Sequence, residues 1–374
     1  MRITDHAARD LAQLHRDVVF GDAGGQIIWQ PRIQCWIGDK LFADGALPAP
    51  YTGMSQADIY RDLGCSARLY DYNECFVRVE HPAVRFETTT LSETDTLRET
   101  ITPVGRLSAV TRSSPNSPRE SKVKWPVVTA EDLRVATWLE DNATWAWDQA
   151  IFDNLYATLG DLGAPTIFMP RVNVQHLYID VSGVMDAVYA LVDYPEEVAA
   201  YFRAIDENHM RMIDVINPSP IEIINFGDNL HCGTLSPGLF EEHVLPAYIR
   251  RNEKLHAAGK FTSSHWDGDV RTLLPFARAC GLDGIEAITP LPQGDVDLET
   301  VKEALGGMFL LDGVSAILFD PLFPQEQLLE QAQRVIDLFA PNLILGIADE
   351  ISSTGDLERV RSVGKLVDDY NAAR

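Results

Sequence analysis

The segment "FTSSHWDGDVRTLL", residues 261–274, combines side chains that bind metal ions. A short apolar run ends at His265, and Asp267 and Asp269 follow within one turn, before a helix-like segment begins. An imidazole and a carboxylate at the end of a strand are suited to a divalent ion such as zinc. We therefore predict that His265 and Asp267 are metal ligands, and that Asp269 caps the helix that follows.

Acidic residues also follow three other predicted strands. "NFGDN" contains Asp228 and Asn229, "DGIEAIT" contains Glu286, and "GIADE" contains Asp349 and Glu350. Like charges held close together raise one another's pKa, so a positive charge should lie among these carboxylates. A divalent metal would supply it, with further metal ligands or catalytic groups drawn from these acidic residues: Asp228, Glu286, Asp349 and Glu350.

Two arginines follow the first and third predicted strands, each directly after a proline. Arg32 lies in "WQPRIQCW" and Arg171 in "FMPRVNVQH". Each arginine either pairs with the acidic rim or anchors a substrate carboxylate, for which a guanidinium is well shaped. We predict that substrate contacts come from these arginines together with Asn229 and Trp266, although a buried core position is the more frequent fate of a tryptophan.

The elements that must position these residues alternate along the chain. Six apolar or β-branched runs separate amphipathic helical stretches, which is typical of a parallel sheet covered by helices. With the run at 25–33 and a further strand near 65–80, they make eight strands and predict an α/β fold, a closed (β/α)8 (TIM) barrel. An open doubly wound sheet is the alternative, but no G-x-G-x-x-G turn follows any strand. The six runs are 165–169, 221–226, 260–264, 283–288, 307–311 and 342–347.

Residues 82–124 interrupt this alternation. The stretch "VRFETTTLSETDTLRETITPVGRLSAVTR" alternates in period two, which predicts a β-hairpin or meander. We expect residues 1–374 to form a single barrel domain, with this insertion near its mouth as a lid or an oligomer contact.

The composition excludes several classes of partner. The chain has 374 residues, with 31 basic and 55 acidic side chains and a formal charge of −24, which repels nucleic acids and anionic membranes. No stretch approaches the ~20 apolar residues that cross a bilayer, and no apolar leader is evident. The five cysteines are scattered, which favours reduced thiols. We expect a cytoplasmic protein.

Three blocks of the sequence carry a resemblance to a known family. The first block is "VSGVMDAVYALVDYPEEVAAYF" and the third is "LILGIADEISSTGDLERVRSVGKLVDDY". The second begins with "NFGDNLHCGTLSPGLFEEHVLPAYIRRNEKLHAAGKFTSSHWDGD" and continues to "EALGG". In this order they resemble the uroporphyrinogen decarboxylase superfamily over residues 160–374, and within it the cobalamin-dependent methyltransferase branch, which includes components of O-demethylase systems. The resemblance implies a (β/α)8 barrel.

The chain departs from this family at two places. The decarboxylases carry an arginine-rich segment after the first strand, whereas "IIWQPRIQCWIGDK" keeps only Arg32. The thiol methyltransferases bind zinc through a histidine, a cysteine two residues later and a cysteine after the last strand. This chain matches the histidine as His265 but has Asp267 and Asp349 at the cysteine positions. An oxygen-rich site is a harder Lewis acid, which suits an ether better than a thiol.

The resemblance and this departure together predict a reaction. We expect a corrinoid-dependent methyltransferase that moves a methyl group from a methoxylated, aromatic substrate to cob(I)alamin, assisted by a divalent metal. Because the chain lacks an Asp-x-His-x-x-Gly motif, the cobalamin should be carried by a separate corrinoid protein. The alternatives are a metal-dependent decarboxylase or lyase of a small acid, and a non-catalytic barrel that binds a tetrapyrrole. A homo-oligomer is possible in each case.

Overall fold

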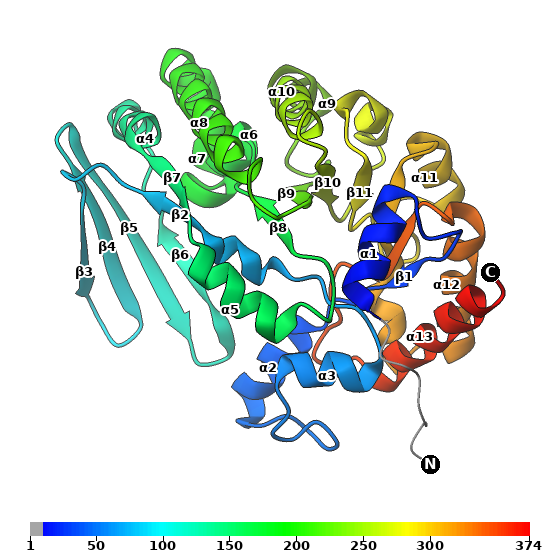
Figure 1. Ribbon diagram of the computed structural model, residues 1–374. Helices are drawn as coiled ribbons and strands as arrows, with labels where there is room; N and C mark the ends of the chain where they lie inside the picture. Colours follow the sequence, from blue (N-terminus) through cyan, green and yellow to red (C-terminus); the bar gives the residue numbers. More distant parts are fainter. Residues whose placement is uncertain (1–9) are drawn as a thin grey trace.

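The computed structural model describes residues 10–374, and its centre is a curled sheet of seven parallel strands (Figure 1). The strand order is β1-β13-β12-β11-β10-β9-β8, and every neighbouring pair is parallel. Both faces of the sheet are covered, so its strands are largely apolar. The strands are β1 (Ile28–Trp29), β8 (Thr166–Met169), β9 (Ile223–Leu230), β10 (Phe261–Trp266), β11 (Gly284–Glu286), β12 (Phe309–Ser315) and β13 (Leu343–Ala348).

The sheet is TIM-like but does not close with an eighth strand. The prediction of a barrel strand near 65–80 is wrong, because β2 (Phe76–Val79) pairs instead with β7 (Thr144–Trp147) in a separate antiparallel ribbon. The extended segment 65–69 runs through the gap between β1 and β8, and its amides donate to Trp29 O and Leu162 O.

A side chain explains why no regular strand forms in this gap. The Asn73 amide accepts from Phe168 N (3.0 Å) and donates to Phe168 O (2.6 Å), so it occupies backbone groups of β8 that an eighth strand would bond.

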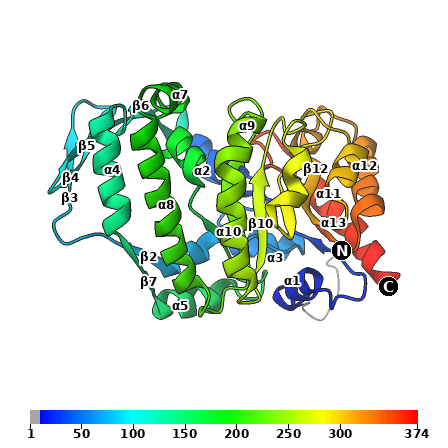
Figure 2. The same ribbon diagram turned by 90° about the horizontal axis from the view of Figure 1, so that it is seen from above.

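Helices surround the sheet on its outer side (Figure 2). Several begin and end as their sequences predict: Asp297 accepts a hydrogen bond from Thr300 N at the start of α11, and Gly306 follows its end with a positive φ. The α-helices of the amino-terminal half are α1 (Leu11–Phe20), α2 (Gln34–Asp44), α3 (Gln56–Leu63), α4 (Ala130–Asn142), α5 (Gln149–Leu159), α6 (Asn173–Gln175) and α7 (Val184–Asp193). Those that follow are α8 (Pro195–Ile216), α9 (Pro237–Leu239), α10 (Leu245–His256), α11 (Leu298–Leu305), α12 (Gln325–Phe339) and α13 (Leu357–Ala372).

Short 3-10 and π-helical turns complete these connections. They are η1 (Tyr70–Cys75), η2 (His176–Val181), η3 (Phe240–Val244), η4 (Leu274–Cys280) and η5 (Ala316–Phe319). Among the described residues 10–374, no helix is both long and apolar enough to cross a bilayer.

The insertion forms a sheet of its own, larger than a hairpin. Four antiparallel strands lie in the order β3-β4-β5-β6 and project from one side of the molecule (Figure 1). One edge is anchored to the body, since Lys122 of β6 contacts the carbonyl of Asp180 and Arg119 lies 3.0 Å from the Cys35 sulfur. The strands are β3 (Arg85–Thr90), β4 (Asp95–Thr102), β5 (Gly105–Ser114) and β6 (Ser117–Lys124).

Candidate functional site

A cavity of about 260 Å³ opens where the parallel strands end. In barrels of this type the loops at the carboxyl ends of the strands carry the functional groups. The side chains around this cavity come from six of the seven parallel strands or the loops beside them, and from η1. They include Arg32, Tyr70, Phe168, Met169, Arg171, His176, Asp180, Asn225, Asn229, His265, Glu286 and Asp349.

Three residues at the mouth of this cavity, His265, Asp267 and Asp349, form what we call the mouth cluster. Each offers one ligand atom, and these atoms all lie within 4.8 Å of one another. The Oδ1 atom of Asp267 is buried and has no hydrogen-bond partner among the described residues. An orphaned carboxylate oxygen beside an imidazole and a second carboxylate fits a divalent cation.

The ring of His265 is held in one orientation by Glu286. Its Nδ1 atom lies 3.1 Å from Glu286 Oε2, so a proton on Nδ1 would be donated to that carboxylate. This arrangement leaves Nε2, which lies 3.9 Å from Asp349 Oδ1, on the side of the mouth cluster. A carboxylate behind a ligating histidine is the usual support of a metal site. Burial lowers the pKa of His265, but the hydrogen bond to Glu286 outweighs it and raises the pKa above its ordinary value.

Glu286 also belongs to a second set of charges below the mouth, Arg68, Glu286 and Asp312, which we call the interior cluster. All three side chains are at most 2% exposed. Arg68 contacts Glu286 and donates to Asp312 Oδ1 at 2.8 Å. Despite burial, Arg68 holds the pKa of Glu286 well below its usual range.

The remaining acceptor positions of Glu286 are also used. Tyr70 donates its hydroxyl proton to Glu286 Oε1 (2.9 Å), and Asn225 Nδ2 donates to Oε2 (2.6 Å). Glu286 was predicted both as a metal ligand and as a catalytic group. The structure places it behind His265, fully engaged with the interior cluster, and outside the three-residue mouth cluster.

The sequence reasoning missed Arg68 and Asp312. Arg68 lies in a segment taken for a barrel strand, and its partners are 218 and 244 residues away along the chain. Asp312 did leave a signal, because it is a single charge inside the apolar run "FLLDGVS". It also has a left-handed backbone, with φ of 82°. Burial raises the pKa of Asp312 to about 6, against the attraction of Arg68.

Arg32 lies between the two clusters and is held by carboxylates. It contacts Asp349, lies 3.2 Å from Glu350 Oε1, and is 4.0 Å from Glu286 Oε1. Glu350 Oε2 also accepts from Cys35 N at 2.7 Å, and this side chain faces a neighbouring cavity of about 380 Å³. The geometry is that of an ion pair, one of the two roles the sequence left open for Arg32.

Another part of the cavity wall contains Arg171 and an aromatic pair. Arg171 donates to Asp180 Oδ1 (2.8 Å) and to Asn229 Oδ1 (3.1 Å), and its buried Nε has no described partner. The rings of Tyr70 and Phe168 meet edge to face, 5.1 Å apart. This wall therefore offers flat apolar surface beside a guanidinium that is not saturated by carboxylates.

Two predicted residues lie elsewhere. Asp228 is buried, and its oxygens accept from Val172 N (2.5 Å) and from the hydroxyl of Tyr248. Burial raises the pKa of Asp228. Trp266 is also buried, with Nε1 3.2 Å from Ser264 Oγ. Neither side chain lines the cavity.

The prediction that Asp269 caps a helix is wrong. Asp295, from a later loop, accepts from the amides of Val270 and Arg271, and these residues form turns that lead into η4. The physical reason is that a tertiary acceptor satisfies these amides, so the local carboxylate is not needed.

Comparison with known proteins places the fold. No protein-family model matches the chain, and no curated protein matches it. Among solved structures, a methyltransferase from Methanosarcina mazei superimposes with a TM-score of 0.57 at 13% identity, over 95% of this chain and 97% of that chain. This likeness covers nearly all of both chains and shows a shared fold. The GH18 chitinase ChiB of Flavobacterium johnsoniae gives a TM-score of only 0.34 at 12% identity, over 59% of this chain and 81% of that chain.

Proposed function

We propose that the protein is a metal-assisted methyltransferase, which moves the methyl group of a methoxylated aromatic compound to cob(I)alamin on a separate corrinoid carrier protein. The observation that carries the proposal is the mouth cluster, three potential ligand atoms within 4.8 Å of one another at a cavity. The fold shared with a methyltransferase and the family resemblance of residues 160–374 support it.

Three residues would hold the metal, and zinc suits their donor atoms. His265 would bind through Nε2, and Asp267 and Asp349 through carboxylate oxygens. When bound there, the ion supplies Lewis-acid stabilisation of negative charge on the ether oxygen.

The surrounding side chains position the substrate and balance charge. Glu286 Oε2 would accept the Nδ1 proton of His265 (Nδ1 to Oε2, 3.1 Å), and Arg32 neutralises part of the charge of Asp349. Tyr70 and Phe168 offer a wall for an aromatic ring, and Arg171 lies within the same cavity. A ring carboxylate on Arg171 would direct the methoxy group toward the mouth cluster.

The proposed transfer balances without an added proton or oxidant. The bond between oxygen and the methyl carbon breaks with its electron pair left on oxygen, as a phenolate. The reduced corrinoid donates the electron pair of the new bond to the methyl carbon. A phenol with a lower pKa gives a better phenolate leaving group, so methyl ethers of such phenols should react faster.

The test is to mix the purified protein with cob(I)alamin and methoxylated benzoates under strictly reducing conditions, and to follow formation of methylcobalamin spectroscopically. The matched samples are protein treated with a chelator, the same protein reloaded with zinc, and the His265→Ala variant. We expect methylcobalamin only from the intact and reloaded protein. The proposal would be wrong if no methoxylated aromatic compound gave methylcobalamin while a small carboxylic acid lost carbon dioxide. The protein would then be a lyase.

A further inference from the structure

The sheet formed by β3 to β6 has two edge strands of opposite character. Edge strands expose unpaired backbone groups, and proteins usually protect them with proline, lysine or irregular register. The β6 edge has all three, since it contains Pro118, Lys122 and Lys124 and its register with β5 shifts twice. The β3 edge, "RFETTT", has none of these features and pairs with β4 without a shift.

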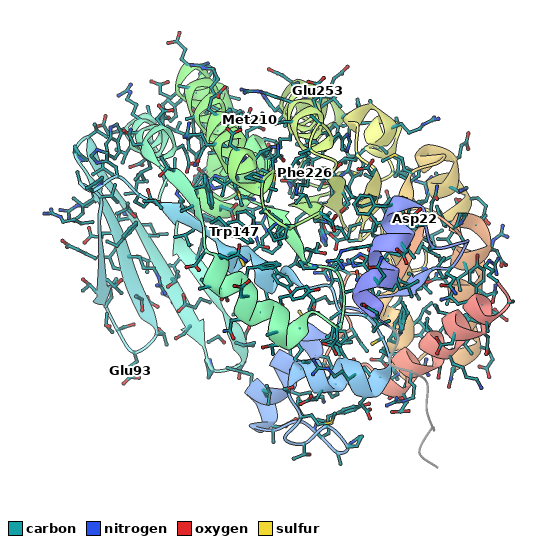
Figure 3. All side chains as sticks on the ribbon, viewed as in Figure 1. Asp22, Glu93, Trp147, Met210, Phe226 and Glu253 are labelled. Carbon is teal, nitrogen blue, oxygen red and sulfur yellow. The ribbon has the colours of Figure 1, made fainter. Side chains whose placement is uncertain are left out.

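The β3 edge is also open. All six of its residues are exposed, and Phe86 is 67% exposed although it is a large apolar side chain. Figure 1 shows β3 as the outermost strand, and Figure 3 shows Glu93, in the turn after β3, at the outer end of the same sheet. In the described part of the chain, no other strand pairs with this edge.

The hydrogen-bond pattern identifies which backbone groups of β3 are free. Leu91 N donates to Asp95 O at the hairpin turn. Because bonded residues alternate along an antiparallel ladder, Arg85, Glu87 and Thr89 direct their backbone groups toward β4. Phe86, Thr88 and Thr90 therefore direct their N–H and C=O groups outward, away from the sheet.

The charges on this strand are self-complementary. Arg85 and Glu87 form no ion pair with any residue in 10–374 for which a contact is described, and Glu87 stands directly opposite Glu99 of β4. Like charges directly opposite one another destabilise a sheet. If a second β3 strand ran antiparallel with Phe86 opposite Phe86, Arg85 of each strand would face Glu87 of the other.

We propose that the protein forms a two-fold dimer in which β3 pairs with β3 of a second copy, with Phe86 on the two-fold axis. In this register the two sheets meet through residues 85–87 of each β3, because Val84 N already donates to His81 O in the turn before the strand. Phe86 of each copy exchanges two backbone hydrogen bonds with its counterpart. Arg85 and Glu87 occupy the non-hydrogen-bonded positions, where side chains approach most closely, so each dimer contains two such ion pairs. The proposal does not depend on the reaction.

The contact is small, so the dimer should depend on protein concentration. Stable interfaces usually bury about 1,600 Å² in total, and pairing of one short strand falls toward the lower end of the range. We expect light scattering and sedimentation to show monomer and dimer in exchange across the micromolar range. The equilibrium should shift toward monomer at high salt, because the ion pairs are exposed.

Charge reversal tests the pairing with an internal control. Arg85→Glu would bring two carboxylates face to face at two positions of the dimer, and Glu87→Arg would bring two guanidinium groups face to face at the same positions. Each single variant should weaken dimerisation by about tenfold or more. The double variant, Arg85→Glu with Glu87→Arg, restores both pairs in reversed order and should dimerise like the original protein. All these positions are exposed, so circular dichroism should show unchanged folding.

Cysteine cross-linking tests the register. Phe86→Cys should form a disulfide-linked dimer under mild oxidation, because the two Cα atoms would lie about 5.5 Å apart. Thr88→Cys should not link to itself, since its two copies would lie about 13 Å apart. The unmodified protein controls for its five native thiols. A monomer at all concentrations, a double variant that stays monomeric, or self-linking through Thr88→Cys alone would each overturn the proposal.

Discussion

The interior cluster and the mouth cluster share a boundary at Glu286 but differ in how their charges are satisfied. In the interior cluster, Arg68 is placed between two carboxylates, both of which accept from it. In the mouth cluster, Asp267 Oδ1 is buried without a partner among the described residues, and Asp349 relies on Arg32 alone among the described arginines. In the interior cluster the protein's own arginine balances the carboxylates, whereas in the mouth cluster a cation could still bind.

This difference has an energetic basis. A buried charge is tolerated only when it is paired and hydrogen-bonded, so a saturated cluster is a structural unit. A set of ligand atoms with too few protein donors is costly for folding alone, and such sites are commonly functional. Variants in the two clusters should therefore separate: those of the interior should change stability, and those of the mouth should change metal binding and turnover.

The largest effect is expected from His265→Ala. Loss of the only imidazole in the mouth cluster should reduce the metal content of the purified protein to near zero and methyl transfer to background, while the melting temperature changes little. Metal analysis and methylcobalamin formation measure the two effects. His256→Ala is the matched control, because His256 also contacts a carboxylate, Asp283 at 2.9 Å, but lies outside the cavity. Full metal occupancy in His265→Ala would refute the ligand assignment.

The interior cluster should respond to Arg68→Met with a loss of stability. Removing one partner of a buried ion pair leaves an uncompensated charge and typically costs about 3–5 kcal/mol. The free energy of unfolding from urea titration should fall by roughly this amount. Arg61→Met is the control, since Arg61 pairs with Asp161 at 2.8 Å on the surface and should cost only about 0–1 kcal/mol. Equal losses for the two variants would contradict the division into clusters.

Glu286→Gln tests the residue of the interior cluster that contacts the mouth cluster through His265. Its charge supports His265 from behind, and loss of such a supporting carboxylate typically weakens metal binding by about 10- to 100-fold. Asp312→Asn removes another carboxylate bonded to Arg68 and tolerates the left-handed backbone, but does not touch the mouth cluster. Zinc titration against a competing chelator should therefore show a large change for Glu286→Gln and a small one for Asp312→Asn.

The interior cluster extends downward to His15. Arg68 Nε donates to Gln30 Oε1 (3.2 Å), and Gln30 Nε2 lies 3.3 Å from His15 Nδ1. Burial, reinforced by Arg68, lowers the pKa of His15 to about 3. Below its ordinary pKa of about 6.5 the unfolded chain binds a proton that the folded protein does not, so stability falls as the pH decreases from there toward 3.

The change between pH 6.5 and pH 5.5 should be about 1 kcal/mol from this one group. His15→Gln removes the titrating group and should flatten the pH dependence of the unfolding free energy in this window. An unchanged slope in the variant would show that other groups dominate acid destabilisation.

The sequence predicted all seven strands of the central sheet: β8 to β13 are apolar runs between helices with clear starts and stops, and β1 lies within the predicted run at 25–33. It failed at the eighth position, where the amide of Asn73 takes the backbone groups of Phe168. No local sequence pattern indicates that a side chain will take the hydrogen bonds of a missing strand. The sequence therefore predicted a closed barrel that the structure does not form.

The mouth was predicted better than the interior for a similar reason. His265, Asp267 and Asp349 follow strands, and parallel strand ends must meet at one edge. Arg68 has no strand pattern around it, and its partners lie more than two hundred residues away. The positive charge expected among the carboxylates was attributed to a metal, with pairing by Arg32 or Arg171 left open, and the fold supplies Arg32 and the unforeseen Arg68.

The smallest effect we expect concerns the substrate, and it sharpens the contrast between two arginines of the same cavity. Arg32 is committed to Asp349 and Glu350, whereas Arg171 has one carboxylate partner, Asp180, and an Nε without a described partner. If Arg171 receives a ring carboxylate, Arg171→Ala should raise KM for a methoxylated benzoate by roughly tenfold and leave the neutral methoxyphenol analogue nearly unchanged.

Arg171→Lys should recover only part of the difference, since lysine keeps the charge but not the planar two-donor geometry. Arg32→Ala should instead disturb metal binding and affect both substrates alike, because its partners are protein carboxylates. A rise in KM of equal size for the charged and neutral substrates in Arg171→Ala would mean that Arg171 serves only to hold Asp180 and Asn229 in place. The charged substrate would then have to be recognised elsewhere, and Arg171 would belong with Arg32 among the structural charges of the barrel.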